Sequence, residues 1–283
     1  MITASSNVWQ AAHGRSLKLD GRGRIMAIVN ATPDSFSDGG RYLAADQAFS
    51  HAIKCVEEGA DIIDIGGEST RPGAADVTES EEQDRILPVI EKLVRESDVL
   101  ISVDTYRAST AKRAIEAGAH IVNDVFGLQK DADMAAVVAA TGAGVCIMHT
   151  GRERQKLDDV IEDQFAFLGI SLEIASKAGI ARGAIVLDPG FGFAKDTDEN
   201  VELMARFGEL DPFGLPILAG TSRKRFVGSL TGRDVATDRD IGTAATTAIL
   251  RMAGASVFRV HNVAMTRDTL AIADAVFARV SKA

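Results

Sequence analysis

The chain has few cysteines, no excess of basic residues and no long apolar run, and each shortage excludes a class of protein. Among its 283 residues only Cys55 and Cys146 are cysteines, and no CxxC motif is present. A scaffold stabilised by several disulfide bonds and a zinc site built on cysteines are therefore excluded. Both cysteines lie in apolar stretches, so two buried free thiols in a reducing compartment are expected.

Acidic residues outnumber basic ones, 40 to 31, which gives a net charge of -9 and a pI near 5.1. This balance argues against a nucleic-acid partner, because such proteins gain much of their affinity by neutralising phosphates. An anionic small molecule stays compatible with it, since a local group of basic side chains outweighs the global charge.

The sequence also lacks membrane and export signals. No stretch reaches the roughly 18 apolar residues of a membrane-spanning helix. Residues 1–23 are polar with scattered apolar positions and lack the continuous apolar core of a signal peptide. We therefore expect a cytoplasmic protein with no membrane partner.

Short β-rich runs alternate with helical patterns after residue 23. The runs predict strands over residues 25–30, 61–66, 100–104, 120–124, 144–149, 184–188, 216–219 and 256–261. Eight strands alternating with helices in a chain of this length predict an α/β protein with the (β/α)8 TIM barrel fold. We expect a single domain over residues 24–283, preceded by a lead-in strand or hairpin within residues 1–23.

An open, doubly wound sheet is the structural alternative. Two features favour the barrel. No GxGxxG motif follows the first run, and polar residues end nearly every predicted strand instead of clustering at one crossover.

Capping signals predict where two of the helices begin. Thr78 with Glu81 three residues on forms a capping-box pattern, and Thr237 with Asp240 forms another. Pro88 predicts a kink or a later start in the first of these helices.

Polar side chains end the predicted strands or follow them closely, and in a barrel these ends converge on one mouth. They are Asn30, Asp64, Asp104, Asn123, Asp124, His149, Asp188, Ser222, Lys224, Arg259 and His261. Helix capping explains any single member of this set. It does not explain the whole set, because a carboxylate at the end of a buried strand is costly without a partner. We therefore expect a polar ligand site at the mouth.

Three of these residues suit the edge of a flat heterocycle. Asp104 and Asp188 supply carboxylate acceptors, and Asn123 supplies an amide that both donates and accepts. Together they fit an edge rich in N–H donors beside a carbonyl, such as a 2-amino-4-oxopyrimidine. Lys224 is expected to donate to a carbonyl or a ring nitrogen in the same plane.

A second group is basic and comprises Arg71, Arg223, Arg259 and His261, with Asn30 beside them. Guanidinium groups suit phosphate oxygens, and Mg²⁺ commonly bridges a protein and a diphosphate through few protein ligands. A single arginine is ordinarily a solvated surface charge. Arg259 differs, because it lies inside an apolar run and its side chain must face something polar.

Two polar loops, residues 31–41 and 68–76, follow the first two strands and are predicted to act as lids. Phe36 is an apolar residue on the first of them and is expected to contact the site or the barrel rim. No Ser–His–Asp or Cys–His arrangement is present, so no covalent nucleophile is expected.

The strings at the strand ends resemble the dihydropteroate synthase family from about residue 24 to the C-terminus. In order they are MAIVNATPDSFSDGG, DIIDIGGESTRPGA, ISVDT, IVNDV, LDPGFGFAK, GTSRKRFVG and FRVH. The resemblance implies a transferase of folate biosynthesis. This enzyme joins 6-hydroxymethyl-7,8-dihydropterin diphosphate to 4-aminobenzoate and releases 7,8-dihydropteroate and diphosphate. The resemblance also implies Mg²⁺ as a cofactor, a homodimer, and sulfonamides as competitors of 4-aminobenzoate.

The resemblance further implies roles for individual residues. The pterin site would comprise Asp104, Asn123, Met148, Asp188 and Lys224. Asn30 would ligate Mg²⁺, and Arg259 and His261 would bind the diphosphate. The aminobenzoate site would comprise Thr70, Arg71, Pro72, Phe193 and Ser222, with Gly220 also lining the substrate site. The catalytic residues would be Asp104, Lys224, Arg71, Arg259 and His261, and Phe36 and Asp38 would belong to the ordered first loop.

Two departures from the family pattern are present. The segment after the fifth strand, MHTGRERQKLDDV, is more charged than the Pro- and Met-containing loop often found there, and Asn262 stands where Asp is common. A non-catalytic pterin-binding paralogue would accommodate both departures. A pterin-binding methyltransferase-type barrel is the other alternative, and the GESTRPG and GTSRKRF segments favour the synthase over it.

Overall fold

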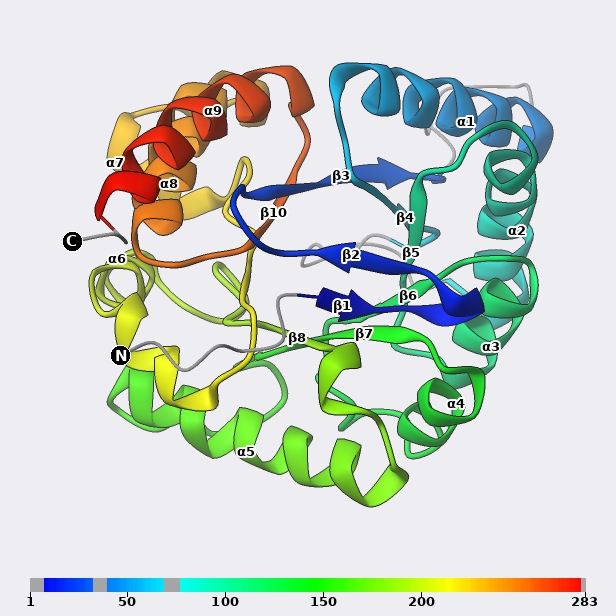
Figure 1. Cartoon of the computed structure of the whole chain (residues 1–283), viewed down its shortest axis with the longest axis horizontal. Coiled ribbons are helices and arrows are strands. Elements are labelled where there is room, and N and C mark those ends of the chain that lie inside the picture. Colours follow the sequence, from blue (N-terminus) through cyan, green and yellow to red (C-terminus); the bar gives the residue numbers. More distant parts are fainter. Residues whose placement is uncertain (1–7, 33–39, 69–76, 281–283) are drawn as a thin grey trace.

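The computed structural model describes residues 8–32, 40–68 and 77–280, which form a barrel of eight parallel strands with helices around it (Figure 1). The strands are β3 (Arg24–Asn30), β4 (Ile62–Gly66), β5 (Leu100–Asp104), β6 (Ile121–Asp124), β7 (Gly144–Met148), β8 (Ile185–Asp188), β9 (Leu218–Ala219) and β10 (Val257–Val260). Their order is β8-β7-β6-β5-β4-β3-β10-β9, and a parallel bridge between Leu187 and Ile217 joins the two edges. The predicted (β/α)8 barrel is confirmed, and every strand overlaps a predicted run.

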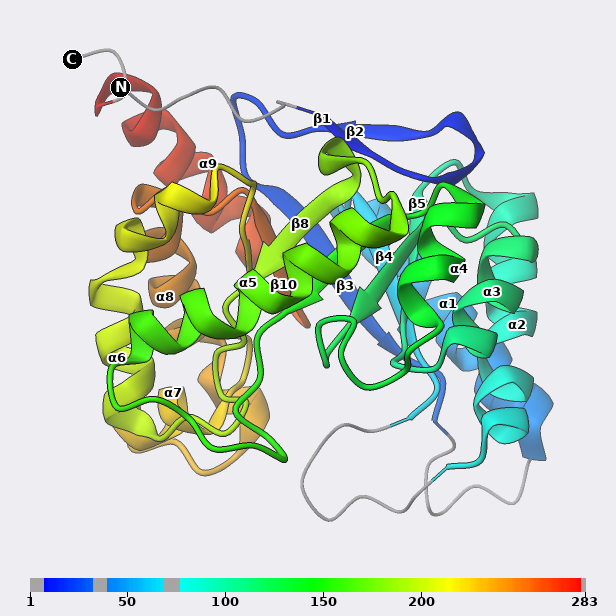
Figure 2. The ribbon, with the colours of Figure 1, turned by 90° about the horizontal axis from the view of Figure 1, so that it is seen from below.

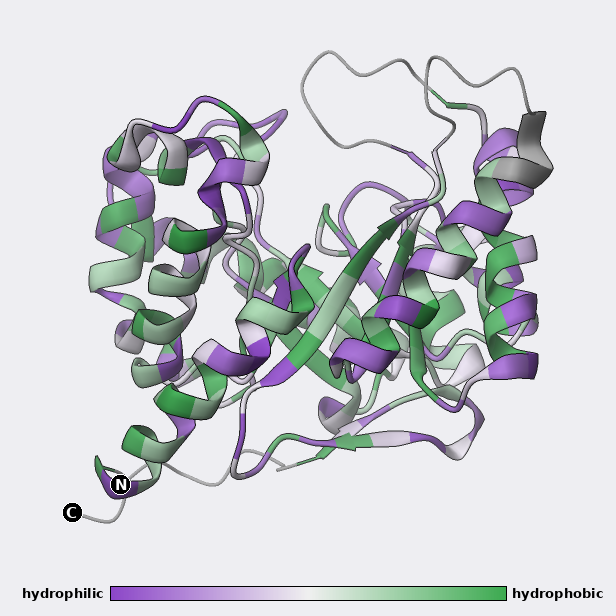
Figure 3. Ribbon diagram, turned by 90° about the horizontal axis from the view of Figure 1, so that it is seen from above, coloured by the Kyte–Doolittle hydropathy of each residue, from purple (hydrophilic) through white to green (hydrophobic). Residues whose placement is uncertain are grey.

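Helices surround the strands and contain both hydrophilic and hydrophobic residues, whereas the strands are mainly hydrophobic (Figure 3). They are α1 (Gly40–Glu58), α2 (Glu79–Glu96), α3 (Ala108–Glu116), α4 (Met134–Thr141), α5 (Val160–Ala178), α6 (Thr197–Ala205), α7 (Arg225–Thr231), α8 (Asp240–Met252) and α9 (Val263–Val280). Alternate strand residues, such as Ile25, Ala27 and Val29 on β3, are buried in the core that includes helical residues. The other face of each strand points into the barrel, so its residues are placed to form a site.

The capping signals identify one helix start and misplace the other. Thr78 Oγ1 accepts from the Glu81 amide, and the Glu81 carboxylate accepts from the Thr78 amide, so the predicted capping box begins α2. α2 continues through Pro88, which excludes a later start. The predicted start at Thr237 is wrong, because Thr237 lies in a 3-10 helix and α8 begins at Asp240. A 3-10 turn at the amino end of an α-helix delays its start in this way.

A hairpin covers the amino-terminal ends of the barrel strands (Figure 2). Its strands, β1 (Val8–Gln10) and β2 (Ser16–Lys18), pair antiparallel, so the predicted lead-in takes the hairpin form. Trp9 is 1% exposed, packs in a cluster with Met26 and Ile62, and donates its ring N–H to the Ala184 carbonyl at 2.9 Å. With this end closed, the carboxyl ends of the strands form the open mouth of the barrel.

The two expected features of the cysteines are present. Cys55 and Cys146 are both buried and free of any disulfide.

Within the described ranges, none of the helices combines the length and the apolar character needed to cross a membrane.

Candidate functional site

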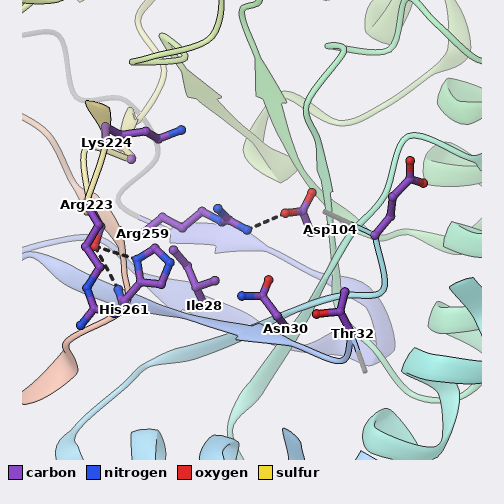
Figure 4. A pocket seen from close by; sticks show the side chains of 11 residues that line it. Ile28, Asn30, Thr32, Asp104, Arg223, Lys224, Arg259 and His261 are labelled. Atoms are coloured by element: carbon purple, nitrogen blue, oxygen red, sulfur yellow. Dashed lines mark hydrogen bonds and ion pairs between the residues drawn. The ribbon is translucent and has the colours of Figure 1, made fainter. Parts of the chain in front are cut away.

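A cavity of about 270 Å³ opens at the carboxyl ends of the strands (Figure 4). It is lined by Ile28, Asn30, Thr32, Glu68, Asp104, Gly220, Ser222, Arg223, Lys224, Arg259 and His261. These residues come from β3, β5 and β10 and from the segments that follow β3, β4, β9 and β10. Because a barrel brings the carboxyl ends of its parallel strands to one rim, residues from both ends of the chain share this cavity.

A buried charge cluster borders the cavity. Arg259 points into the barrel from β10, and its Nε donates to Asp64 Oδ2 at 2.6 Å while its Nη2 donates to Asp104 Oδ2 at 2.5 Å. Asp64 is completely buried and also accepts from Asn123 Nδ2 at 3.1 Å. The prediction that Arg259 faces polar groups is confirmed. Both carboxylates gain a cationic partner, which offsets the cost of removing them from water.

Burial shifts the proton equilibria of the cluster toward neutral forms. It raises the pKa of Asp104 to about 7, against the opposing effect of Arg259. Burial also raises the pKa of Asp188 and lowers the pKa of Lys224 to about 8. The charges of Lys224 and Arg259 act on both carboxyl groups, so the four side chains share one electrostatic neighbourhood. Groups that titrate near neutral pH in a cavity are typical of functional sites.

An apolar cluster flanks the charged one. Met148, the last residue of β7, packs with Val125 and Phe193 and is paired with Asp188 in the ladder between β7 and β8. Lys224 Nζ lies 4.0 Å from the centroid of the Phe193 ring, a cation–π contact that joins the two clusters. The site therefore offers an apolar surface beside a few directed polar groups, the combination that binds planar ligands.

Ser222 and His261 hold each other at the rim of the cavity. The His261 amide donates to Ser222 Oγ at 3.1 Å, and the same oxygen lies 2.9 Å from His261 Nδ1. These two bonds fix the imidazole where it lines the cavity together with Arg259 (Figure 4). The pair therefore holds the imidazole on the same wall as the guanidinium, which suits an anionic ligand.

Arg223, which the sequence places in the basic group, lines the cavity and forms an ion pair. Its guanidinium donates to Asp240 through Nε at 2.7 Å and Nη2 at 2.9 Å, and its backbone has a φ of 57°. A residue with a side chain keeps this left-handed φ only where its surroundings impose it. The ion pair with the start of α8 thus fixes the turn that carries Ser222 and Lys224 to the cavity.

The same ion pair accounts for Asn262, one of the two departures from the family pattern. Asn262 Nδ2 donates to Asp240 Oδ2 at 2.9 Å, and its Oδ1 accepts from the Met265 amide at 3.1 Å in the first turn of α9. An ionised aspartate has no N–H to donate and would place two carboxylates side by side. The amide at Asn262 therefore matches the carboxylate of Asp240.

The structure brings together the described residues that the sequence assigns to the site. Those that line the cavity are Asn30, Asp104, Gly220, Ser222, Lys224, Arg259 and His261. Those that contact or act on this set are Asn123, Met148, Asp188 and Phe193. The predicted residues Phe36, Asp38, Thr70, Arg71 and Pro72 lie outside the described residues.

The sequence places Asp64 at the mouth but gives it no role of its own, and it does not assign Ile28, Thr32 or Glu68, which also line the cavity. Asp64 is the most informative of these residues. It lies in the middle of β4, between Ile63 and Ile65, and it accepts hydrogen bonds from both Arg259 and Asn123. The signal was present in the sequence, because a carboxylate inside an apolar run must find a polar partner just as Arg259 must.

Residues 26–261 match the family model described as pterin binding enzyme, which gives the class of protein that this fold and site define. Dihydropteroate synthase of Bacillus subtilis is 45% identical over 239 residues, which are 84% of this chain and 83% of that protein. Among solved structures, Xanthomonas albilineans dihydropteroate synthase with 4-aminobenzoic acid is 43% identical, with a TM-score of 0.90 over 96% of this chain and 99% of that one. The same enzyme in complex with 7,8-dihydropteroate is 41% identical, with a TM-score of 0.86 over 95% and 99% of the two chains. The chain belongs to the dihydropteroate synthase family.

The substitution Asp64→Asn tests whether the charge cluster contributes to the fold. The variant keeps the shape of the side chain but leaves Arg259 with Asp104 as its remaining carboxylate partner in the cluster. We expect the free energy of unfolding in urea to fall by roughly 3 kcal/mol, as for the breaking of a buried ion pair. Asp98→Asn, at an exposed carboxylate, is the control and should change it by less than about 0.5 kcal/mol. Equal effects of the two substitutions would contradict a structural role for the cluster.

Proposed function

We propose that the protein condenses 6-hydroxymethyl-7,8-dihydropterin diphosphate with 4-aminobenzoate to give 7,8-dihydropteroate and diphosphate. The observation that supports this proposal is that Asp104, Lys224 and Arg259 line one cavity. Asn123 adjoins them through its hydrogen bond to Asp64, and Asp188 lies within reach of the charges of Lys224 and Arg259. The carboxyl groups of Asp104 and Asp188, the amide and the amine supply acceptors and donors for the amino–oxo edge of the pterin. A guanidinium at the same wall suits the diphosphate.

The departing diphosphate accumulates negative charge as the reaction proceeds. Arg259 and His261 line the cavity, where their N–H groups would bind this charge, and the sequence predicts that Arg71 joins them. Donors fixed in advance stabilise developing charge without reorganising during the reaction. Arg259 is fixed by its two carboxylates and His261 by Ser222.

The bond changes need no nucleophilic side chain. The C–O bond between the pterin methylene and the diphosphate breaks, and the amine nitrogen of 4-aminobenzoate forms the new C–N bond and releases one proton. The ionised carboxyl group of Asp104 would favour positive charge on the pterin as the diphosphate leaves. We infer that bond breaking precedes amine attack. If diphosphate were never released in the absence of 4-aminobenzoate, this order would be wrong.

Steady-state release of diphosphate from the pterin diphosphate, measured with and without 4-aminobenzoate, tests the proposed function. We expect 7,8-dihydropteroate to form only when both substrates are present. Lys224→Ala should lower kcat/KM by about 100-fold or more, because it removes the proposed contact with the pterin. Lys177→Ala, at an exposed position on α5, should leave turnover unchanged. Wild-type turnover in the Lys224 variant would show that the pterin site is misplaced.

The same assay separates the alternative functions. Binding of methyltetrahydrofolate without consumption of 4-aminobenzoate would favour a methyltransferase-type barrel. Binding of a pterin without turnover would favour a non-catalytic paralogue. For the synthase we expect sulfonamides to compete with 4-aminobenzoate, and a complete lack of competition would contradict the assignment of Thr70, Pro72 and Ser222 to its site.

We also propose that Mg²⁺ assists this reaction. Asn30 ends β3 with an exposed side chain on the cavity wall, and in the part of the chain that the structure describes no three His, Cys, Asp or Glu side chains gather as a metal site. This donor set fits Mg²⁺, which keeps several waters and is commonly held by one or two protein oxygens together with substrate phosphates. Asn30 would hold the ion, which when bound offsets the negative charge of the diphosphate.

Removal of divalent cations tests this role of Mg²⁺. EDTA should abolish diphosphate release, and added Mg²⁺ should restore it. Asn30→Ala should raise the Mg²⁺ concentration needed for half-maximal activity by about tenfold, because it removes a protein ligand. Full activity in EDTA would contradict a role for the ion.

We infer that the protein is a homodimer. Apolar side chains stand in solvent on α8 and α9, which pack side by side, and Ile241 and Ile272 are 77% and 71% exposed. Val276 and Val280 follow Ile272 on α9 at intervals of four residues, so these three exposed side chains share one face of the helix. Contiguous exposed apolar surface is typical of an interface between subunits.

We also infer a cytoplasmic location from the two free thiols, and recovery from an oxidising compartment would contradict it.

Sedimentation velocity tests the dimer. The wild type should sediment as a dimer, and Ile241→Glu combined with Ile272→Glu should produce monomers, because buried charges oppose association. Val201→Glu, at an exposed valine on α6, is the matched control and should leave the dimer intact. A monomeric wild type would contradict the inference.

A further inference from the structure

Three buried titratable side chains, which follow β7 and β8 or lie on α5, take no part in the chemistry described above. His149 follows β7 and is 0% exposed, Lys195 lies in the loop after β8 and is 8% exposed, and Asp163 lies on α5. Lys195 Nζ is 2.9 Å from His149 Nδ1, and His149 Nε2 is 3.0 Å from Asp163 Oδ2. This chain of contacts joins three separate elements of the barrel.

Polar neighbours engage both ring nitrogens of His149. Nδ1 faces the amine of Lys195, and Nε2 faces Asp163 Oδ2 and also Arg154 Nη2, which lies 2.9 Å away. Burial lowers the pKa of His149 to about 4 and that of Lys195 to about 7, so the imidazole is neutral near neutral pH and the amine has N–H groups to donate in either state. Arg154 completes the chain by donating to the two oxygens of Asp163 at 2.8 and 2.6 Å.

Lys195 also fastens its own loop, residues 189–196. Its Nζ donates to the Gly190 carbonyl at 3.0 Å. Gly190 has a φ of 67°, and a Cβ at this position would lie 1.9 Å from the His149 carbonyl oxygen, so the loops after β7 and β8 approach very closely. Ala194 has a φ of 52°, which a residue with a side chain keeps only where contacts impose it. Lys195, the next residue, supplies two such contacts.

Phe193 lies on this fastened loop, with its ring 4.0 Å from Lys224 Nζ. We propose that Lys195 is a positioning residue: its bridge to His149 fixes loop 189–196 so that Phe193 lies at the aminobenzoate side of the cavity. The bridge thereby sets the affinity of the enzyme for its second substrate. This inference rests on the proposed function and on the predicted role of Phe193. The charged segment after β7 contributes to the same hydrogen-bond network, because Arg154 belongs to this segment.

The substitution Lys195→Met tests this proposal, because methionine fills the buried space and cannot make either hydrogen bond. We expect KM for 4-aminobenzoate to rise by about tenfold or more, while KM for the pterin diphosphate stays within about twofold and kcat within about threefold. Lys177→Met is the matched control on the exposed face of α5 and should change none of the three. A merely structural loss would instead lower kcat or raise both KM values together, and either result would overturn the proposal.

A second variant keeps the test decisive if Lys195→Met does not fold, as judged by circular dichroism. Arg154→Met leaves the bridge between Lys195 and His149 in place but removes two donors from Asp163 and the neighbour of His149 Nε2. It should raise KM for 4-aminobenzoate by a smaller factor. In the double variant, the rise should be less than the product of the two single effects, because the residues act as one unit. Unchanged KM in Arg154→Met, or independent effects in the double variant, would overturn the proposal.

The wild-type assay separates this inference from the proposed function. An inactive wild type overturns both. An active wild type with an unchanged Lys195→Met variant overturns only the positioning role.

Discussion

The interior of the barrel contains the guanidinium of Arg259, which stays charged at any physiological pH, and the neighbouring strands are arranged to satisfy it. Its partners Asp64 and Asp104 lie on the adjacent strands β4 and β5, whereas Arg259 lies on β10. These strands come together only because β3 pairs with both β4 and β10. Leaving one of the charges unpaired would cost several kcal/mol, of the order of 3–5. The assembly of the site is therefore tied to the pairing of the first barrel strand with the last.

The strands and the segments that connect them contribute different residues to the site. The strands hold the charged residues inside the barrel, where backbone pairing fixes their positions. The segments after the strands hold residues of the rim, and they are fixed by contacts that lie outside the cavity. The pair Arg223–Asp240 holds the turn after β9, and the pair Lys195–His149 holds the loop after β8. Each of these turns contains a residue with a side chain at positive φ, which indicates that the contacts hold the backbone in a shape it would not adopt alone.

The sequence predicts the strands closely because the signals of a strand, an apolar β-branched run and a polar end, are local. It also predicts that Arg259 faces polar groups, but it does not identify Asp64 as the partner, because the two residues are 195 positions apart and meet only through the register of the barrel. The sequence groups Arg223 with the basic residues by its charge, but nothing in its spacing reveals that the carboxylate of Asp240 at the start of α8 is its partner. The helix start predicted at Thr237 is wrong because the same residue types begin 3-10 turns and α-helical turns.

The hairpin that closes the barrel also determines which structural changes the tryptophan fluorescence of the protein can detect. Trp9 is the sole tryptophan of the chain, and it is buried at the end opposite the cavity. Its emission will follow detachment of the hairpin and global unfolding, whereas a ligand at the mouth lies across the whole length of the barrel from it. Fluorescence titrations must therefore take their signal from the pterin ring, and tryptophan emission serves as an independent record of whether the scaffold is intact.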